Sequence, residues 1–106
     1  MDFVASHISF LFAASMTDNI CGQIRRLREG RDAGGLTEED PEWWFIDAAI
    51  WTLRVQALES MLDQIYEELP PAAQAHSERE LDNMRLQVTL RMRTRARLLA
   101  QAARES

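Results

Sequence analysis

Apolar residues recur at helical spacing in three stretches of the chain, which predict helices over about residues 2–29, 41–69 and 78–104. The expected fold class is all-α, with one domain over residues 1–106 and the last two helices paired as an antiparallel hairpin. Between the first two stretches, residues 30–40 hold three of the four glycines together with several acids. This composition predicts a flexible loop.

The first predicted helix is apolar around most of its circumference. One face of this helix is formed by Ile20, Ile24 and Leu27, and Gly30 is its expected end. A second apolar stripe and further residues, which include Phe10 and Phe12, fill much of the remaining circumference. A helix of this kind must be covered on more than one side. We therefore expect a homodimer, with a closed monomer that wraps this helix on two sides as the alternative, and we place Phe10 and Phe12 among the candidate partner-binding residues.

The second predicted helix carries the most regular pattern. Asp40 followed by Pro41 is a typical helix start, and Pro70 with Pro71 predicts its end. Spacings of four and three residues alternate along it and define a core seam: Trp44, Trp51, Val55, Leu58, Leu62 and Ile65. A flanking stripe that includes Ile46 and Ile50 widens the apolar face, so this helix is expected to contact at least two others.

The third predicted helix has apolar residues on two sides. Ser77 and Glu80 have the spacing of a capping box, which predicts a start at Glu78. Most of its apolar residues share one face, expected to meet the second helix. Leu86 and Leu90 lie on the opposite face and have no partner in a plain three-helix bundle, so we expect a second copy or another protein to cover them.

Large side chains also crowd the first turn of the second helix, at Trp43, Trp44, Phe45 and Ile46. One helical face cannot bury all four. Core packing accounts for Trp44, whereas Trp43, Phe45 and Ile46 are candidate anchors for a protein partner, because aromatic residues often dominate binding energy.

Charge and composition narrow the functional classes. The net charge is −5, yet all twelve basic residues are arginine and seven of them follow residue 77. Arg91, Arg93, Arg95 and Arg97 could suggest nucleic-acid binding, since guanidinium groups pair with phosphates. Helical geometry places Arg91 and Arg95 on one side and the other two elsewhere. We therefore favour a solvated or acid-paired helix and keep nucleic-acid binding as the runner-up.

The sequence offers no pattern for catalysis, a metal or a cofactor. Its two histidines lie in different segments, no phosphate-binding glycine loop occurs, and Cys21 lies among apolar residues where a buried, inert thiol is expected. A single cysteine cannot form an internal disulfide, and the uncharged run at 3–16 lacks a basic leader and is too short to span a bilayer. We expect a cytoplasmic protein that is neither an enzyme nor membrane-bound.

Three helices in about a hundred residues, an aromatic-led middle helix (EWWFIDAAIWTLRVQALESMLDQI) and all-arginine basic content resemble small pseudomonad regulators of the QslA antiactivator type. The resemblance covers most of the chain. It implies a helical dimer that binds the ligand-binding domain of a LuxR-type quorum-sensing activator and prevents that activator from dimerising and binding DNA. The expected function is thus a protein-binding inhibitor or regulator. A phage or plasmid inhibitor of a host defence complex, or a toxin neutraliser, fits the same physical features.

Overall fold

The computed structural model describes residues 19–106, and every regular element in that range is a helix. An N-terminal helix occupies residues 19–33, followed by α2 (Pro41–Ile65), the short 3-10 helix η1 (Tyr66–Glu68) and the long α3 (Pro71–Glu105). The predicted all-α class is confirmed.

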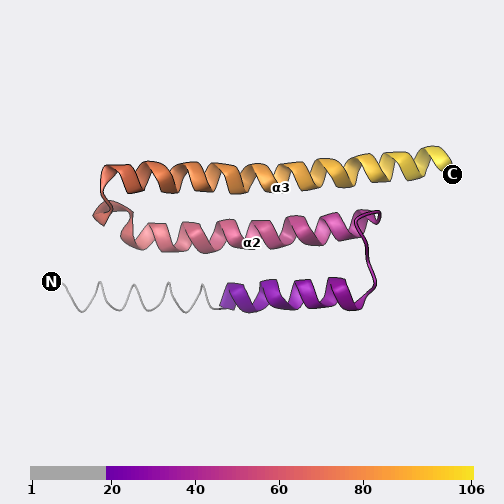
Figure 1. The fold of residues 1–106 in the computed structure, drawn as a ribbon, viewed down its shortest axis with the longest axis horizontal. Coiled ribbons are helices and arrows are strands. Elements are labelled where there is room, and N and C mark those ends of the chain that lie inside the picture. The colour runs from indigo at the N-terminus through magenta and orange to yellow at the C-terminus, as the bar shows by residue number, and fades with distance from the viewer. Residues whose placement is uncertain (1–18) are drawn as a thin grey trace.

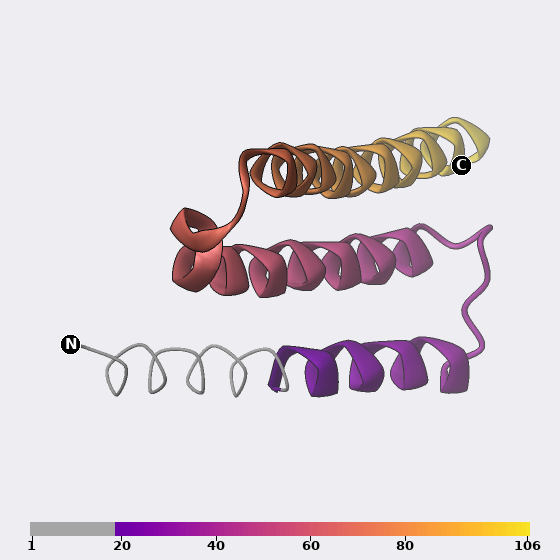
Figure 2. The ribbon, with the colours of Figure 1, turned by 60° about the vertical axis from the view of Figure 1, so that its left-hand side comes forward.

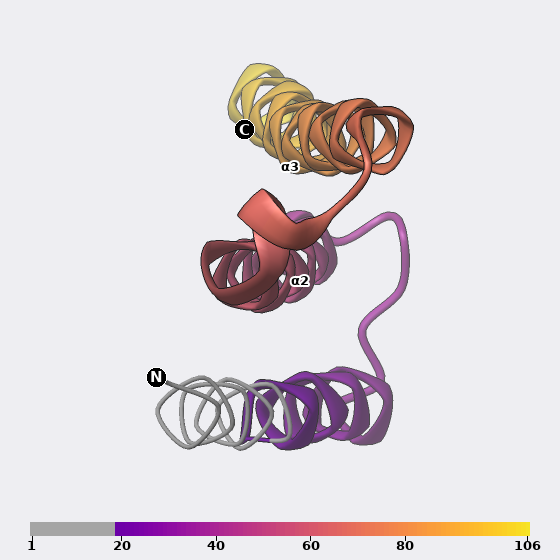
Figure 3. The same ribbon diagram turned by 90° about the vertical axis from the view of Figure 1, so that its left-hand side faces the viewer.

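The three helices lie side by side in a single layer with α2 in the middle (Figures 1 and 2). The end-on view in Figure 3 shows the N-terminal helix and α3 on opposite sides of α2. The shortest extent of the molecule is 14 Å, half of the 28 Å of the next, so the layer is flat. The radius of gyration of 17.7 Å exceeds the roughly 13 Å of a compact domain of this length. Within residues 19–106, no further helix therefore lies over either broad face of this layer.

Few side chains are buried in this layer. Among the described residues the fully buried apolar side chains are Ile20, Ala48, Ile50, Val55 and Leu62, of which four belong to α2 and none to α3. The core is thus a narrow line along α2. Val55 and Leu62 come from the predicted seam, whose other four members are half-buried. The most buried residue, Ile50, comes from the flanking stripe and is 1% exposed.

The predicted start of α2 is confirmed, but its end is not. Pro41 occupies the first helical position, while the Asp40 carboxylate accepts a hydrogen bond from the Thr37 backbone N–H at 2.8 Å instead of capping the helix. At the other end α2 stops at Ile65, and η1 tightens the chain before Leu69, which is extended. Because a residue that precedes proline disfavours the helical conformation, the helix cannot reach residue 69 as predicted.

Gly30 does not end the N-terminal helix, which continues to residue 33. The residue that reverses the chain is Gly35, whose φ of +71° is readily adopted only by glycine. Its N–H donates to the Asp32 carbonyl, and the Gly34 N–H donates to the Gly30 carbonyl, which satisfies the last turn of the helix. The loop is therefore shorter than predicted and spans 34–40.

The predicted capping box at Ser77 and Glu80 is wrong, because α3 begins at Pro71. Proline suits the first helical position, since the N–H that it lacks would have no partner there. The Gln74 N–H donates to the Pro70 carbonyl at 3.0 Å, and three alanines in this turn favour the helix. Ser77 lies inside α3.

Polar contacts join η1 and α2 to α3 along their length. The Gln74 side chain donates to the Tyr66 carbonyl at 2.8 Å, and Arg85 pairs with Glu59 at 3.0 Å. Farther along, Arg91 of α3 meets Asp47 of α2. As the contacts advance along α3 they move backward along α2, so the two helices run in opposite directions.

The Tyr66 hydroxyl donates to the Glu78 carboxylate across the turn, and this bond raises the pKa of Tyr66 above its ordinary value of 10.0. Since the folded pKa is raised, the bond contributes to stability below pH 10 and is lost as the pH rises through the folded pKa. The chain has one tyrosine, so an ultraviolet titration of the phenolate reports on it alone. We expect Glu78→Gln to lower the pKa of Tyr66, whereas Glu80→Gln leaves it unchanged. Identical curves for both variants would show that the bond is absent.

Candidate functional site

Asp47 connects all three helices at the loop end of the layer. Its carboxylate accepts from Arg31 Nη1 at 2.8 Å and from Arg91 Nε at 2.5 Å. The side chains of Asp47, Arg31 and Arg91 are 14%, 12% and 20% exposed. Because these charges are mostly removed from water, the shared carboxylate is the buried partner of both arginines, and Arg31 also lies 3.5 Å from the exposed carboxylate of Asp32. We call Asp47, Arg31 and Arg91 the Asp47 cluster.

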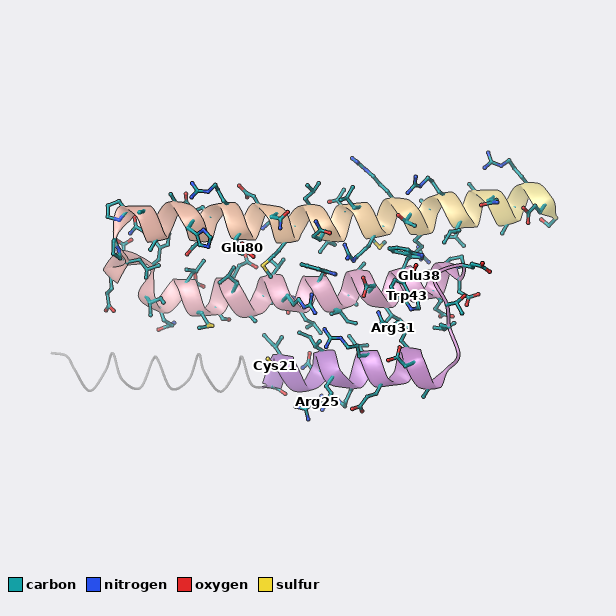
Figure 4. All side chains as sticks on the ribbon, in the orientation of Figure 1. Cys21, Arg25, Arg31, Glu38, Trp43 and Glu80 are labelled. Atoms are coloured by element: carbon teal, nitrogen blue, oxygen red, sulfur yellow. The ribbon has the colours of Figure 1, made fainter. Side chains whose placement is uncertain are left out.

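Tryptophan rings surround the Asp47 cluster. The guanidinium carbon of Arg31 lies 4.5 Å from the centroid of the Trp43 ring, and that of Arg91 lies 4.7 Å from the Trp51 ring. Arg54 also lies over Trp51, at 4.6 Å. Figure 4 shows Arg31 and Trp43 between the N-terminal helix and α2. Cation–π contacts of this kind reinforce the junction of the three helices.

Sequence reasoning missed the Asp47 cluster, although a signal was present. Asp47 follows Trp44 by three residues and precedes Trp51 by four, which places a carboxylate on the apolar seam. A charge in that position needs a partner, and arginine supplies one.

Phe45 lies on an uncovered face of α2 and is 50% exposed. It borders a groove of about 470 Å³ whose lining is apolar apart from Thr52: Phe45, Ala48, Ala49, Thr52, Leu53, Val88 and Met92. We call this the Phe45 groove. Arg95 approaches the ring of Phe45 at 5.1 Å, and Met92 is 37% exposed.

The remaining sequence-predicted partner residues do not gather at one place. Leu86 and Leu90 on α3 are 49% and 42% exposed, and neither lines the Phe45 groove. Trp43 and Ile46 are half-buried, and Trp43 contacts Arg31 and packs edge-on against Trp44 with ring centroids 4.9 Å apart. Two further predictions, Phe10 and Phe12, lie outside the described residues.

A second groove, of about 590 Å³, crosses all three helices. Its apolar lining includes Ile24, Leu58, Met61 and Met84, and arginines of the N-terminal helix and α2 join it: Arg25, Arg28 and Arg54. The lining also includes Cys21 on the N-terminal helix and Glu80 on α3, which Figure 4 labels. We call it the arginine groove.

The arginine run of α3 is divided between two surroundings. Arg91 and Arg95 are half-buried against α2, where they contact Asp47 and Phe45. Arg93 and Arg97 are exposed, and Arg97 donates to the Thr94 hydroxyl at 3.1 Å. The run therefore does not form one continuous basic stripe.

No protein-family model matches the chain, and comparisons with curated proteins and with solved structures found no match either. Within residues 19–106, no three histidine, cysteine or acidic side chains come close enough together to hold a metal ion. In the same range no helix has the length and apolar character needed to cross a bilayer. The geometry of the grooves is thus the main guide to function.

The expected burial of Cys21 is wrong, since the thiol is exposed. A single layer of helices leaves one side of the N-terminal helix without cover, and Cys21 lies there at the rim of the arginine groove.

We expect iodoacetamide to alkylate Cys21 in the folded protein at a rate close to that of a free thiol, because no unfolding is needed for access. Replacement by serine should change the free energy of unfolding by less than about 0.5 kcal/mol, as is usual at exposed positions. Mass spectrometry and a denaturant titration measure the two effects. Alkylation that requires denaturant would contradict the exposed position.

Proposed function

We propose that this chain is a non-enzymatic regulator that binds another protein and acts by covering its surface. The observation that supports this proposal is a layer one helix thick with large apolar side chains exposed along it: Phe45, Met61, Leu86, Leu90, Met92 and Leu99. Apolar patches on soluble proteins commonly mark sites of association. Two grooves with different chemistry provide separate surfaces for self-association and for a target.

The Phe45 groove is the proposed self-association surface. Interfaces that persist in homodimers are more apolar than transient ones, and this groove contains a single polar side chain, Thr52. A second copy that packs its own α2 and α3 on this face would turn one layer into two and would enclose a core.

Light scattering at micromolar concentration is expected to give twice the monomer mass of 12.2 kDa. Phe45→Ala should shift the chain toward monomer, with a loss of about 1–4 kcal/mol of association energy, because an aromatic anchor is removed from the interface. Leu86→Ala is the matched control, since Leu86 is equally exposed but lies outside the groove. A wild-type chain that remains at 12.2 kDa would contradict the dimer.

In line with the resemblance to QslA-type antiactivators, we propose a cytoplasmic LuxR-type quorum-sensing activator as the target. The regulator would occupy the surface through which the activator dimerises, so that the activator no longer binds DNA. The exposed apolar side chains of the layer support this role, because they offer a surface that could replace the activator's own partner.

Capture of the tagged chain from its native host, followed by mass spectrometry, tests this function. The proposal expects one stoichiometric protein partner that binds the purified chain directly. Nucleic-acid binding is less well supported, because Arg91 already pairs with Asp47 and the chain carries a net charge of −5. Recovery of DNA or RNA alone, with affinity that falls steeply as salt rises, would favour that alternative.

A further inference from the structure

The arginine groove combines an apolar floor with guanidinium groups in a chain that is acidic as a whole. Its floor includes Leu58, Met61 and Met84, and Met61 is 40% exposed. Methionine side chains adapt to different apolar surfaces and are common at binding sites for helices. The groove therefore has the apolar component that an amphipathic helix requires.

The charges at this groove are unbalanced. Arg25, Arg28 and Arg54 join the lining, against one acid, Glu80. Asp47 already pairs with two other arginines, Arg31 and Arg91. Within residues 19–106, no carboxylate lies within 4.0 Å of the guanidinium group of Arg54.

Arg54 contacts the Trp51 ring, but other arginines lie nearby and part of its surrounding water is removed. Its pKa is lowered below the ordinary value of an arginine, chiefly because burial removes water and then because Arg28 lies nearby; Asp47 raises this pKa in part, and Arg91 lowers it further. An added anion would relieve this repulsion. Carboxylates suit guanidinium groups well, because both oxygens can accept from one arginine.

From this combination we infer that the arginine groove binds an acidic amphipathic helix of the protein target, with apolar side chains on the floor and carboxylates toward Arg28 and Arg54. The inference rests on the proposed function and specifies its target surface. Helix-in-groove recognition uses apolar anchors at three- and four-residue spacing. The net charge of −5 disfavours a polyanion such as DNA, whereas a short helix with a few glutamates needs only the local arginines.

A fluorescein-labelled synthetic helix of about 20 residues, long enough to cross the layer, serves as the probe. It carries leucines at three- and four-residue spacing flanked by glutamates, and its twin carries lysines at the glutamate positions. By fluorescence anisotropy we expect the glutamate helix to bind at least about tenfold more tightly than the lysine twin, a difference of about 1.4 kcal/mol. The bound glutamate helix should also slow alkylation of Cys21, which lines the groove.

Charge reversal locates the site. Arg28→Glu with Arg54→Glu should weaken binding of the glutamate helix at least about tenfold and should strengthen binding of the lysine twin. Arg93→Glu with Arg97→Glu, on the outer side of α3, makes the same change in net charge and should leave both affinities unchanged. Circular dichroism establishes that each variant is folded. If the charge reversal disturbs folding, the double variant Arg28→Gln with Arg54→Gln removes the two charges without reversing them and should weaken binding of the glutamate helix in the same direction.

Several results would overturn the inference: no binding of the glutamate helix, equal binding of the lysine twin, equal loss in both reversal variants, or displacement by single-stranded DNA at physiological salt. The captured target separates this inference from the proposed function. If it binds the Arg28 and Arg54 variant as tightly as the wild type, the groove assignment fails and the function stands. If no target is captured, the proposed function fails whatever the peptide does.

Discussion

Asp47→Ala should lower the free energy of unfolding by about 3 kcal/mol, because it leaves Arg91 without a carboxylate and leaves Arg31 with only the exposed Asp32 at 3.5 Å, both in a mostly dehydrated position. The loss should affect both helix pairs at once, since Asp47 connects the N-terminal helix and α3 to α2. Denaturant titration at one fixed protein concentration measures it, because association adds to the apparent stability.

Asp63→Ala is the matched control for this variant. Asp63 also lies on α2 but is exposed, and its replacement should change stability by less than about 0.5 kcal/mol. Equal effects of the two substitutions would show that the Asp47 cluster does not hold the layer together.

The second large effect is expected at Ile50. Ile50→Ala should cost about 3 kcal/mol, the middle of the range for emptying a buried aliphatic site, because Ile50 is the largest fully buried side chain. Leu58→Ala should cost less, since Leu58 is half-buried at the arginine groove. Leu86→Ala, at an exposed edge, should cost less than about 0.5 kcal/mol. A smaller loss at Ile50 than at Leu58 would contradict the observed core.

Local signals predicted much of the helical structure. Pro41 starts α2 and the Pro70–Pro71 pair separates it from α3, because proline constrains the backbone whatever its surroundings. The capping-box pattern predicted the wrong start for α3, because Ser77 and Glu80 also fit inside a helix that has already begun at Pro71. The prediction that Gly30 ends the first helix failed for a similar reason: glycine is tolerated in a helix, and within residues 19–106 only Gly35 has a positive φ.

Tertiary arrangement was harder to predict, because periodicity identifies apolar faces without saying which are covered. The seam of α2 predicted contacts on more than one side, yet not a single open layer in which Ile50 is more buried than Trp44 or Leu58. The two grooves depend on residues that are far apart in sequence, such as Arg28 and Arg54. Their proximity could be found only once the helices were placed.

The central claim is that the exposed apolar surface of the layer is covered when a protein partner binds. The heat-capacity change of binding, measured by calorimetry at several temperatures with the captured target, tests this claim most directly, because burial of apolar surface makes that change negative. We predict a clearly negative value that becomes smaller in magnitude in Met61→Ala. A value near zero, together with an affinity that falls steeply with salt, would contradict the account and would point to binding by charge alone.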